Sequence, residues 1–179
     1  DAYGKIIDFQ IENGADALIV CATTGEAPTL DDDEHLEAIS YAVDRVKKRI
    51  PVIAGTGSNN TAHAIMMNKE AEKRGADGLL WVSPYYNKAT QKGLLLHYKA
   101  LAASTSLLAI LYNVPSRTGV NIKPETIEEL SYIDNICGVK EASGDVSVAV
   151  DILRRCGDRI DLYSGNDDII VPLMSIGAK

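Results

Sequence analysis

Two hydrophobic periodicities alternate along the chain and predict strands and helices in strict succession. Short apolar runs predict strands, and the run at 17–22 is continuous enough for a strand buried on both faces. Apolar residues that recur every three or four positions predict the intervening helices. The predicted strands cover residues 17–22, 51–54, 78–82, 107–111, 136–140 and 160–163, and the predicted helices cover residues 1–13, 33–49, 61–74, 90–104, 124–130, 146–155 and 169–176.

This alternation predicts parallel strands joined by helical crossovers, in an open doubly wound sheet or in a (β/α) barrel. The best candidate for a dinucleotide-binding turn, residues 55–60, lacks the third glycine of that motif. Polar and aromatic residues instead follow successive strands, as they do around the site of a barrel. These residues are Thr23, Thr24, Thr56, Tyr85, Tyr86, Tyr112, Lys140 and Ser164. Because fewer strands are predicted than a closed (β/α)8 TIM barrel contains, we expect an incomplete barrel of six strands.

Lys140 lies within an apolar strand, where an ammonium group is costly to bury. One interpretation is an edge strand whose lysine extends into water. The other is a nucleophile at the carboxyl end of a barrel strand, which burial keeps neutral so that it forms an imine with a ketone or aldehyde. We expect Ile136 and Val139 to provide the apolar walls that such a lysine needs.

Three further features favour the imine, although each has a purely structural alternative. Tyr112 ends the preceding strand, and its hydroxyl relays protons unless it is an ordinary core tyrosine. The turn at Thr23 and Thr24 offers hydroxyls and backbone N–H groups to a small carboxylate, or it is a capped turn. Arg117 lies on a loop after the tyrosine strand and binds a second carboxylate, or it forms a surface ion pair.

Composition and charge narrow the classes of function. The 179 residues are 46% hydrophobic and carry a formal net charge of -7, which argues against nucleic acid or an anionic membrane as a partner. No apolar run is long enough to span a bilayer, and no signal peptide is recognised. The three cysteines lack metal-site spacing, and reduced thiols predict a cytoplasmic protein. The three histidines lie on three different predicted helices and indicate no metal site.

Five motifs occur in a specific order along the chain. They are Thr23-Thr24-Gly25-Glu26, Pro84-Tyr85-Tyr86-Asn87, Tyr112-Asn113-Val114-Pro115-Ser116-Arg117-Thr118-Gly119, Gly138-Val139-Lys140-Glu141-Ala142 and Ser164-Gly165-Asn166-Asp167. Together they resemble the 4-hydroxy-tetrahydrodipicolinate synthase family, formerly called dihydrodipicolinate synthase, in the superfamily of N-acetylneuraminate lyase. The resemblance implies a (β/α)8 barrel followed by a small helical domain. It also implies a class I aldolase-type condensation of pyruvate with L-aspartate 4-semialdehyde, in lysine and diaminopimelate biosynthesis.

The same resemblance implies roles for four residues in the chemical steps. Lys140 would form the pyruvate imine, so that no cofactor is expected, and Tyr112 would be the main proton donor and acceptor. Thr23 would link Tyr112 to Tyr86 in a proton relay. Tyr86 would act in the site of the neighbouring subunit, within a homotetramer built from tight dimers.

Other residues would bind substrates or regulators. Thr24 would bind the carboxylate of pyruvate, Arg117 would guide that of the semialdehyde, and Gly165 would line the site. The positions that correspond to the lysine-inhibition site of some members are Ala27, Asp32, His35, Asn59, His63 and Tyr85. Ala27, Asp32 and His63 differ from the lysine-sensitive bacterial pattern, so we expect no feedback inhibition by lysine.

Relative to this family, residues 1–179 are expected to form one partial catalytic domain that lacks the first and last barrel strands and the helical domain. Such a piece would leave strand edges open, and we expect it to be inactive alone. Two other functions stay open. A sister lyase would act through the same imine on a sugar acid, such as N-acetylneuraminate or a keto-deoxy sugar acid. The second is a catalytically silent scaffold or regulatory paralogue. The retention of Lys140, Tyr112 and Thr23 argues against it.

Overall fold

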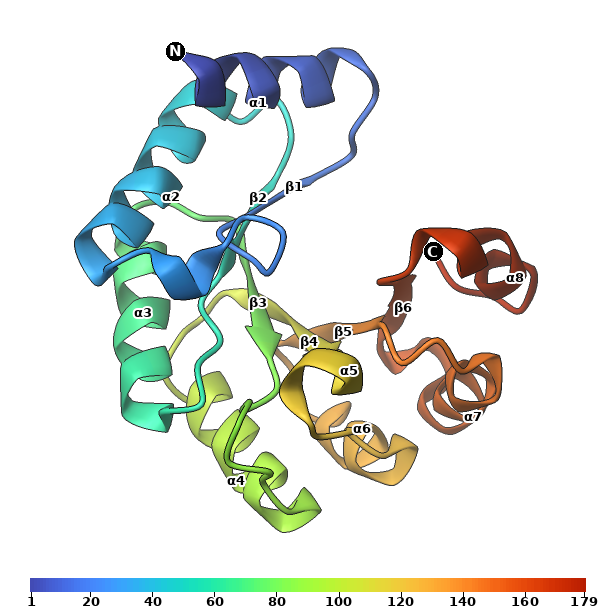
Figure 1. The fold of residues 1–179 in the computed structure, drawn as a ribbon. Helices are drawn as coiled ribbons and strands as arrows, with labels where there is room; N and C mark the ends of the chain where they lie inside the picture. The colour runs from blue at the N-terminus through green and yellow to red at the C-terminus, as the bar shows by residue number, and fades with distance from the viewer.

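Six parallel strands form one curled sheet in the computed structural model, which describes all of residues 1–179 (Figure 1). The strands lie in the sheet in chain order, and every neighbouring pair is parallel. They are β1 (Leu18–Val20), β2 (Val52–Gly55), β3 (Gly78–Val82), β4 (Leu108–Asn113), β5 (Ile136–Glu141) and β6 (Asp161–Ser164). The predicted alternation is confirmed, and so is the incomplete six-stranded barrel. The sheet does not close, since β1 and β6 lie at its two edges.

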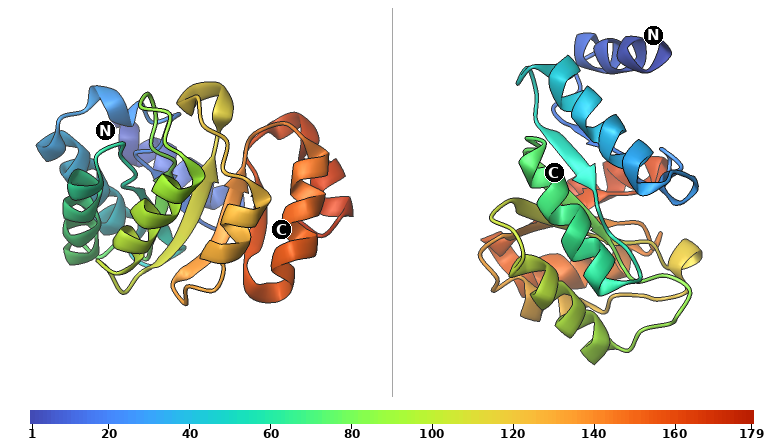
Figure 2. Two further views of the ribbon diagram at one scale, coloured as in Figure 1. Left: turned by 90° about the horizontal axis from the view of Figure 1, so that it is seen from below. Right: turned by 90° about the vertical axis from the view of Figure 1, so that its left-hand side faces the viewer.

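Helices cover the outer, convex side of the curled sheet, as Figures 1 and 2 show. The predicted ones are α1 (Ala2–Glu12), α2 (Asp32–Val46), α3 (Thr61–Lys73), α4 (Gln91–Ala102), α6 (Pro124–Leu130), α7 (Val146–Cys156) and α8 (Ile170–Ser175). Elements too short for a periodicity were not predicted: α5 (Pro115–Thr118) and the 3₁₀ turns Ala27–Thr29, Gly157–Arg159 and Asp167–Ile169. None of the helices combines the length and apolar character that crossing a bilayer demands.

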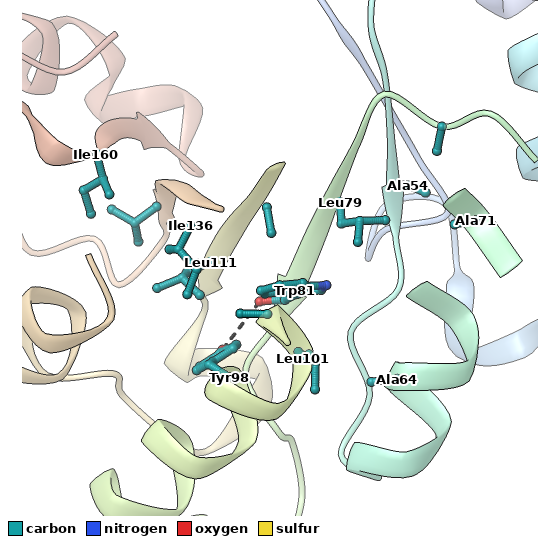
Figure 3. Packing of buried hydrophobic residues seen from close by; sticks show 14 of the residues in the cluster. Ala54, Ala64, Ala71, Leu79, Trp81, Tyr98, Leu101, Leu111, Ile136 and Ile160 are labelled. Carbon is teal, nitrogen blue, oxygen red and sulfur yellow. Dashed lines mark hydrogen bonds between the residues drawn. The ribbon is translucent and has the colours of Figure 1, made fainter. Parts of the chain in front are cut away.

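Buried side chains form two clusters on opposite faces of the sheet. The larger cluster fills the space between the sheet and the outer helices, where Trp81 of β3 meets Tyr98 of α4 (Figure 3). The smaller cluster lies on the inner face and includes Leu80, Tyr112 and Val114. Because successive residues of a strand point to opposite faces, Leu80 and Trp81 belong to different clusters. The inner face, unlike the outer one, is therefore not covered by the helices that follow the strands.

Strand β1 is less buried than its apolar run predicts. Of its three residues only Val20 is buried, and Ile19 is 39% exposed. The prediction of a strand buried on both faces is wrong here, because β1 lies at an edge of the sheet and pairs with β2 alone. An apolar run predicts a strand, but it does not show how many neighbouring strands and helices cover that strand.

A buried histidine of α4, His97, faces the start of α3. The Nδ1 atom of His97 is 2.9 Å from the hydroxyl of Thr61, whereas its Nε2 atom is buried without a hydrogen-bond partner. The side chain of Tyr98 packs edge-on against the imidazole. Burial disfavours the charged form and lowers the pKa of His97 to about 4.

This histidine predicts a specific acid sensitivity. An unfolded histidine has a pKa of 6.5, so the unfolded state binds more protons once the pH falls below that value. The contribution of neutral His97 is complete above this pH and is lost as the pH falls toward 4. We expect the free energy of unfolding, measured with urea, to fall by about 2 kcal/mol between roughly pH 7.5 and 5 because of this group.

The variant His97→Gln should lose this part of the pH dependence. His63→Gln, which alters a histidine with a 37% exposed side chain, is the matched control and should keep it. An unchanged pH dependence in His97→Gln would contradict the assignment to His97.

Candidate active site at the carboxyl end of the sheet

Lys140 and Tyr112 are direct neighbours across strands β5 and β4. The register pairs Tyr112 with Lys140, and Lys140 with Tyr163 of β6. Residues paired in this way point to the same face, so both side chains lie on the inner face of the curled sheet. The Lys140 Nζ atom lies 4.6 Å from the centroid of the Tyr112 ring. The structure therefore brings together the two residues expected to approach each other at adjacent strand ends.

The surroundings of Lys140 differ from the sequence expectation in one respect. Ile136 and Val139 do not form its apolar walls, because both belong to the cluster under the helices on the other face. Val139 lies there because strand residues alternate between faces, and a register irregularity between Ala109 and Ile110 shifts Ile136 to the same side. The ring of Tyr112, which is only 6% exposed, covers the ammonium group instead.

The half-buried position of Lys140 changes its acid–base behaviour. Burial lowers the pKa of the Lys140 ammonium below its ordinary value, because the charged form loses hydration. The carboxylate of Asp167, in the turn after β6, acts in the opposite direction and favours the charged form. The balance leaves an amine that is easier to deprotonate than a surface lysine.

A cavity of ≈ 820 Å³ opens at this end of the sheet. Four of the candidate catalytic and substrate-binding residues line it, namely Thr23, Tyr86, Tyr112 and Arg117. Lys140 lies beside this cavity and not in its lining, since it is on the next strand toward the open β6 edge. Tyr112 belongs to the lining and also carries Lys140 over its ring, so it is the point of contact between the lysine and the cavity.

The turn after β1 presents unused hydrogen-bond donors. Backbone N–H groups of Glu26 and Ala27 bond within the turn, but those of Thr23, Thr24 and Gly25 donate to no group of the chain. Thr24 is exposed, and Thr23 is partly buried beside the cavity. Neighbouring free N–H groups of this kind can bind a carboxylate. No hydrogen bond joins Thr23 to Tyr112 or to Tyr86 within this chain.

Two candidate residues project from segments that follow strands. Arg117 lies exposed in α5, the short helix that begins two residues after β4, and not on a loop as the sequence indicated. Tyr86 is 88% exposed and has a positive φ of 73°, which is uncommon for a residue with a side chain. Both side chains therefore extend away from the core at the mouth of the cavity.

Gly165 follows β6, where only a glycine fits. A Cβ atom there would lie 2.5 Å from the Cβ atom of Ala142. The Gly165 N–H donates to the backbone oxygen of Glu141 at 2.7 Å, which ties the turn after β6 to β5. The close approach of the two backbones at this point explains the absence of a side chain.

The six positions matched to a lysine-binding site also lie near one another. Ala27, Asp32, His35, His63 and Tyr85 line the same cavity, and the Asn59 side-chain amide donates to the backbone oxygen of Tyr85 at 3.3 Å. Here His63 pairs with Asp32 at 2.9 Å. The absence of lysine inhibition, expected from Ala27, Asp32 and His63, stays a prediction.

Two buried polar residues at this end were not singled out in the sequence. Asn113 is 0% exposed and Glu141 is 1% exposed, and each directly follows a member of the tyrosine–lysine pair. The Asn113 amide donates to the Glu141 carboxylate at 2.8 Å. A carboxylate directly after Lys140 in an apolar strand was the available signal, since alternation places it on the core face. Nowhere in the structure do three or more His, Cys, Asp or Glu side chains gather as a metal site would require.

The fold and the site define a (β/α)-barrel protein with a lysine–tyrosine pair at the carboxyl ends of its strands. The family model described as the Dihydrodipicolinate synthetase family matches residues 1–179, and the chain belongs to that family. The 4-hydroxy-tetrahydrodipicolinate synthase of Caldicellulosiruptor saccharolyticus is 55% identical over 177 residues, which are 99% of this chain and 60% of that protein.

Solved structures agree in fold. The dihydrodipicolinate synthase of Bacillus anthracis has a TM-score of 0.97 at 45% identity, covering 98% of this chain and 60% of that one. The chloride-inhibited dihydrodipicolinate synthase of Acinetobacter baumannii, solved in complex with pyruvate, has a TM-score of 0.96 at 44% identity, covering 98% and 60% respectively. The chain thus spans about 60% of the length of the curated relatives it matches.

The opposing effects on Lys140 predict the outcome of a charge substitution. In Asp167→Asn the carboxylate that favours the ammonium form is removed, so the pKa of Lys140 should fall further. The measurement is the pH dependence of amine modification at Lys140, followed by peptide mass spectrometry. Asp168→Asn, which neutralises the adjacent exposed carboxylate, is the control and should leave the midpoint in place. A midpoint that stays constant or rises in Asp167→Asn would refute this electrostatic account.

Proposed function

We propose that the whole protein, of which residues 1–179 are expected to form one partial catalytic domain, condenses pyruvate with L-aspartate 4-semialdehyde through an imine on Lys140, giving 4-hydroxy-tetrahydrodipicolinate. The observation that carries this proposal is the register pairing of Lys140 with Tyr112, which sets an amine of lowered pKa over a tyrosine ring at the carboxyl end of the sheet. Membership of the dihydrodipicolinate synthetase family supports the same reaction.

The chemistry follows from the properties of an imine. Neutral Lys140 attacks the C2 carbonyl of pyruvate and water leaves, so the new C=N bond draws electrons from the adjacent methyl carbon. Loss of a proton from that carbon gives an enamine, which forms a carbon–carbon bond to the aldehyde of the second substrate. The amino group of that substrate then displaces Lys140 and closes the ring. Lys140 supplies the electron sink, so the proposed reaction needs no further cofactor.

Tyr112 is the proton donor and acceptor in this proposal. Its ring contacts the Lys140 amine, and it lines the same cavity as Thr23 and Tyr86. We assign Thr23 to a proton relay between the two tyrosines. Their hydroxyls are not joined within one chain, which fits a relay that is completed in the assembled protein.

Two groups receive the carboxylates of the substrates. The unused N–H groups around Thr24 suit the pyruvate carboxylate. The exposed guanidinium of Arg117, at the mouth of the cavity, suits the carboxylate of the semialdehyde through paired hydrogen bonds. Gly165 keeps the β6 side of the site free of a side chain.

The partner of the proposed assembly is a second copy of the protein. Tyr86 is held at a positive φ with 88% of its surface exposed, as suits a side chain that enters the site of a neighbouring subunit. We assign it that role in a homotetramer built as a dimer of dimers.

Trapping with borohydride tests the central step. Reduction in the presence of pyruvate should attach the substrate irreversibly to Lys140, and peptide mapping should locate it there. Lys140→Arg should abolish trapping because a guanidinium stays protonated. Lys88→Arg is the matched control, since Lys88 lines the cavity but is not paired with Tyr112. An adduct at any other lysine would overturn the proposed mechanism. Turnover with an N-acyl sugar and not with aspartate semialdehyde would instead identify a sister lyase.

A conservative change tests the role of the tyrosine. Tyr112→Phe removes the hydroxyl and keeps the ring over Lys140, so we expect kcat to fall by about 100- to 10,000-fold with the fold retained. Tyr163→Phe is the matched control, because Tyr163 pairs with Lys140 from the other side. Its kcat should stay within about threefold of the unmodified protein, since the cation–π contact with the amine is made by the Tyr112 ring and not by that of Tyr163. Equal losses in both variants would remove the specific role of Tyr112.

A further inference from the structure

We infer that Glu141 is a positioning residue: with Asn113 it clamps the ends of β4 and β5 and thereby holds Lys140 against Tyr112. The inference deepens the proposed function and rests on it for its meaning in catalysis. The clamp itself is a property of the strand ends, and it can be measured without substrate.

The clamp sits one residue beyond the reactive pair. The register pairs Asn113 with Glu141 immediately after it pairs Tyr112 with Lys140. Because side chains alternate along a strand, Asn113 and Glu141 point to the helix side, whereas Tyr112 and Lys140 point to the inner face. A hydrogen bond of 2.8 Å from Asn113 Nδ2 to Glu141 Oε2 joins the two side chains. A change in this bond therefore acts on Lys140 through the backbone and not by contact.

The clamp extends to the neighbouring segments. The other oxygen of Glu141 accepts from the Ser143 N–H at 2.6 Å, and its backbone oxygen accepts from Gly165 beyond β6 at 2.7 Å. Asn113 also donates to the Asn121 side chain at 2.8 Å and accepts from the Ile122 N–H at 3.0 Å. These bonds connect β4 and β5 with the turn after β6 and with the segment that follows α5. Arg117 lies in α5 itself.

Because Glu141 is buried, its carboxyl group needs hydrogen-bond donors at fixed positions. Its side chain forms no ion pair with a lysine, arginine or histidine, and the residue is 1% exposed. A buried carboxylate is costly unless hydrogen-bond donors are fixed around it. Here the donors are one amide and one backbone N–H on different segments. An apolar side chain would fill the space, but it would not fix the strand ends relative to each other.

Glu141→Gln is the most informative variant. It keeps the shape but replaces one acceptor oxygen with an NH₂ group, so it cannot accept from both Asn113 and Ser143. A small misplacement of reacting groups costs about 100-fold in rate, and we expect a loss of kcat of about that size per folded protein. The KM for pyruvate should change by less than about fivefold, since the carboxylate-binding groups lie elsewhere.

A second readout separates positioning from simple stabilisation. If the strand ends move apart, Lys140 becomes better hydrated, and its pKa rises toward the ordinary value. The pH midpoint of amine modification at Lys140 should therefore move upward in Glu141→Gln. Glu141→Asp keeps the carboxylate on a shorter side chain and should show a smaller shift and a smaller loss of kcat. Should Glu141→Gln fail to fold, the same two measurements on Glu141→Asp decide the question.

The matched control is Glu72→Gln. Glu72 also fixes a backbone segment through its carboxylate, which accepts from Thr105 at 2.8 Å and from Ser106, but at the opposite end of β4. The variant Glu72→Gln should lower the free energy of unfolding. It should change neither the pH midpoint of amine modification at Lys140 nor kcat per folded protein. An unchanged midpoint and kcat in folded Glu141→Gln, or an equal effect in Glu72→Gln, would overturn the inference. If the unmodified protein forms no pyruvate adduct on Lys140, the proposed function fails, whereas the amine-modification midpoints still decide whether Glu141 positions the lysine.

Discussion

The parallel register of β4 and β5 is the constraint on which the rest of the site depends. It sets Tyr112 beside Lys140 on the inner face and Asn113 beside Glu141 on the helix side, in two consecutive steps along the strands. A slip by one residue would exchange the faces and move the lysine to the closely packed side under the helices, away from the inner face. The reactive pair and the polar clamp therefore have one structural cause.

The two faces of the sheet provide different environments. The helix side is closely packed around Trp81, Leu111 and their neighbours, so a polar group there needs hydrogen-bond partners, and each carboxyl oxygen of Glu141 has one. The inner face is covered by few side chains, and a half-buried amine there loses part of its hydration but stays reachable from the cavity side. The lowered pKa of Lys140 follows from this intermediate burial, and the Asp167 carboxylate moderates it.

Most of the architecture could be predicted from the sequence because long periodic segments dominate it. All six strands and the seven longer helices occur where expected. The approach of Tyr112 to Lys140 could be predicted too, since adjacent parallel strands end at the same edge. The walls around Lys140 could not, because the irregularity near Ala109 and the alternation of Val139 depend on pairing that no single strand encodes. Helix α5 was missed because four residues hold no periodicity. The Asn113–Glu141 bond was missed because partners 28 residues apart are invisible in a local pattern.

A crystal structure of the protein soaked with pyruvate would show directly whether Lys140 forms the imine. We expect continuous electron density from the Lys140 Nζ atom to C2 of pyruvate, with the substrate carboxylate on the N–H groups of the Thr23–Thr24 turn and the Tyr112 hydroxyl facing the new bond. Pyruvate bound in the cavity without a bond to Lys140, or bonded to another lysine, would contradict this expectation.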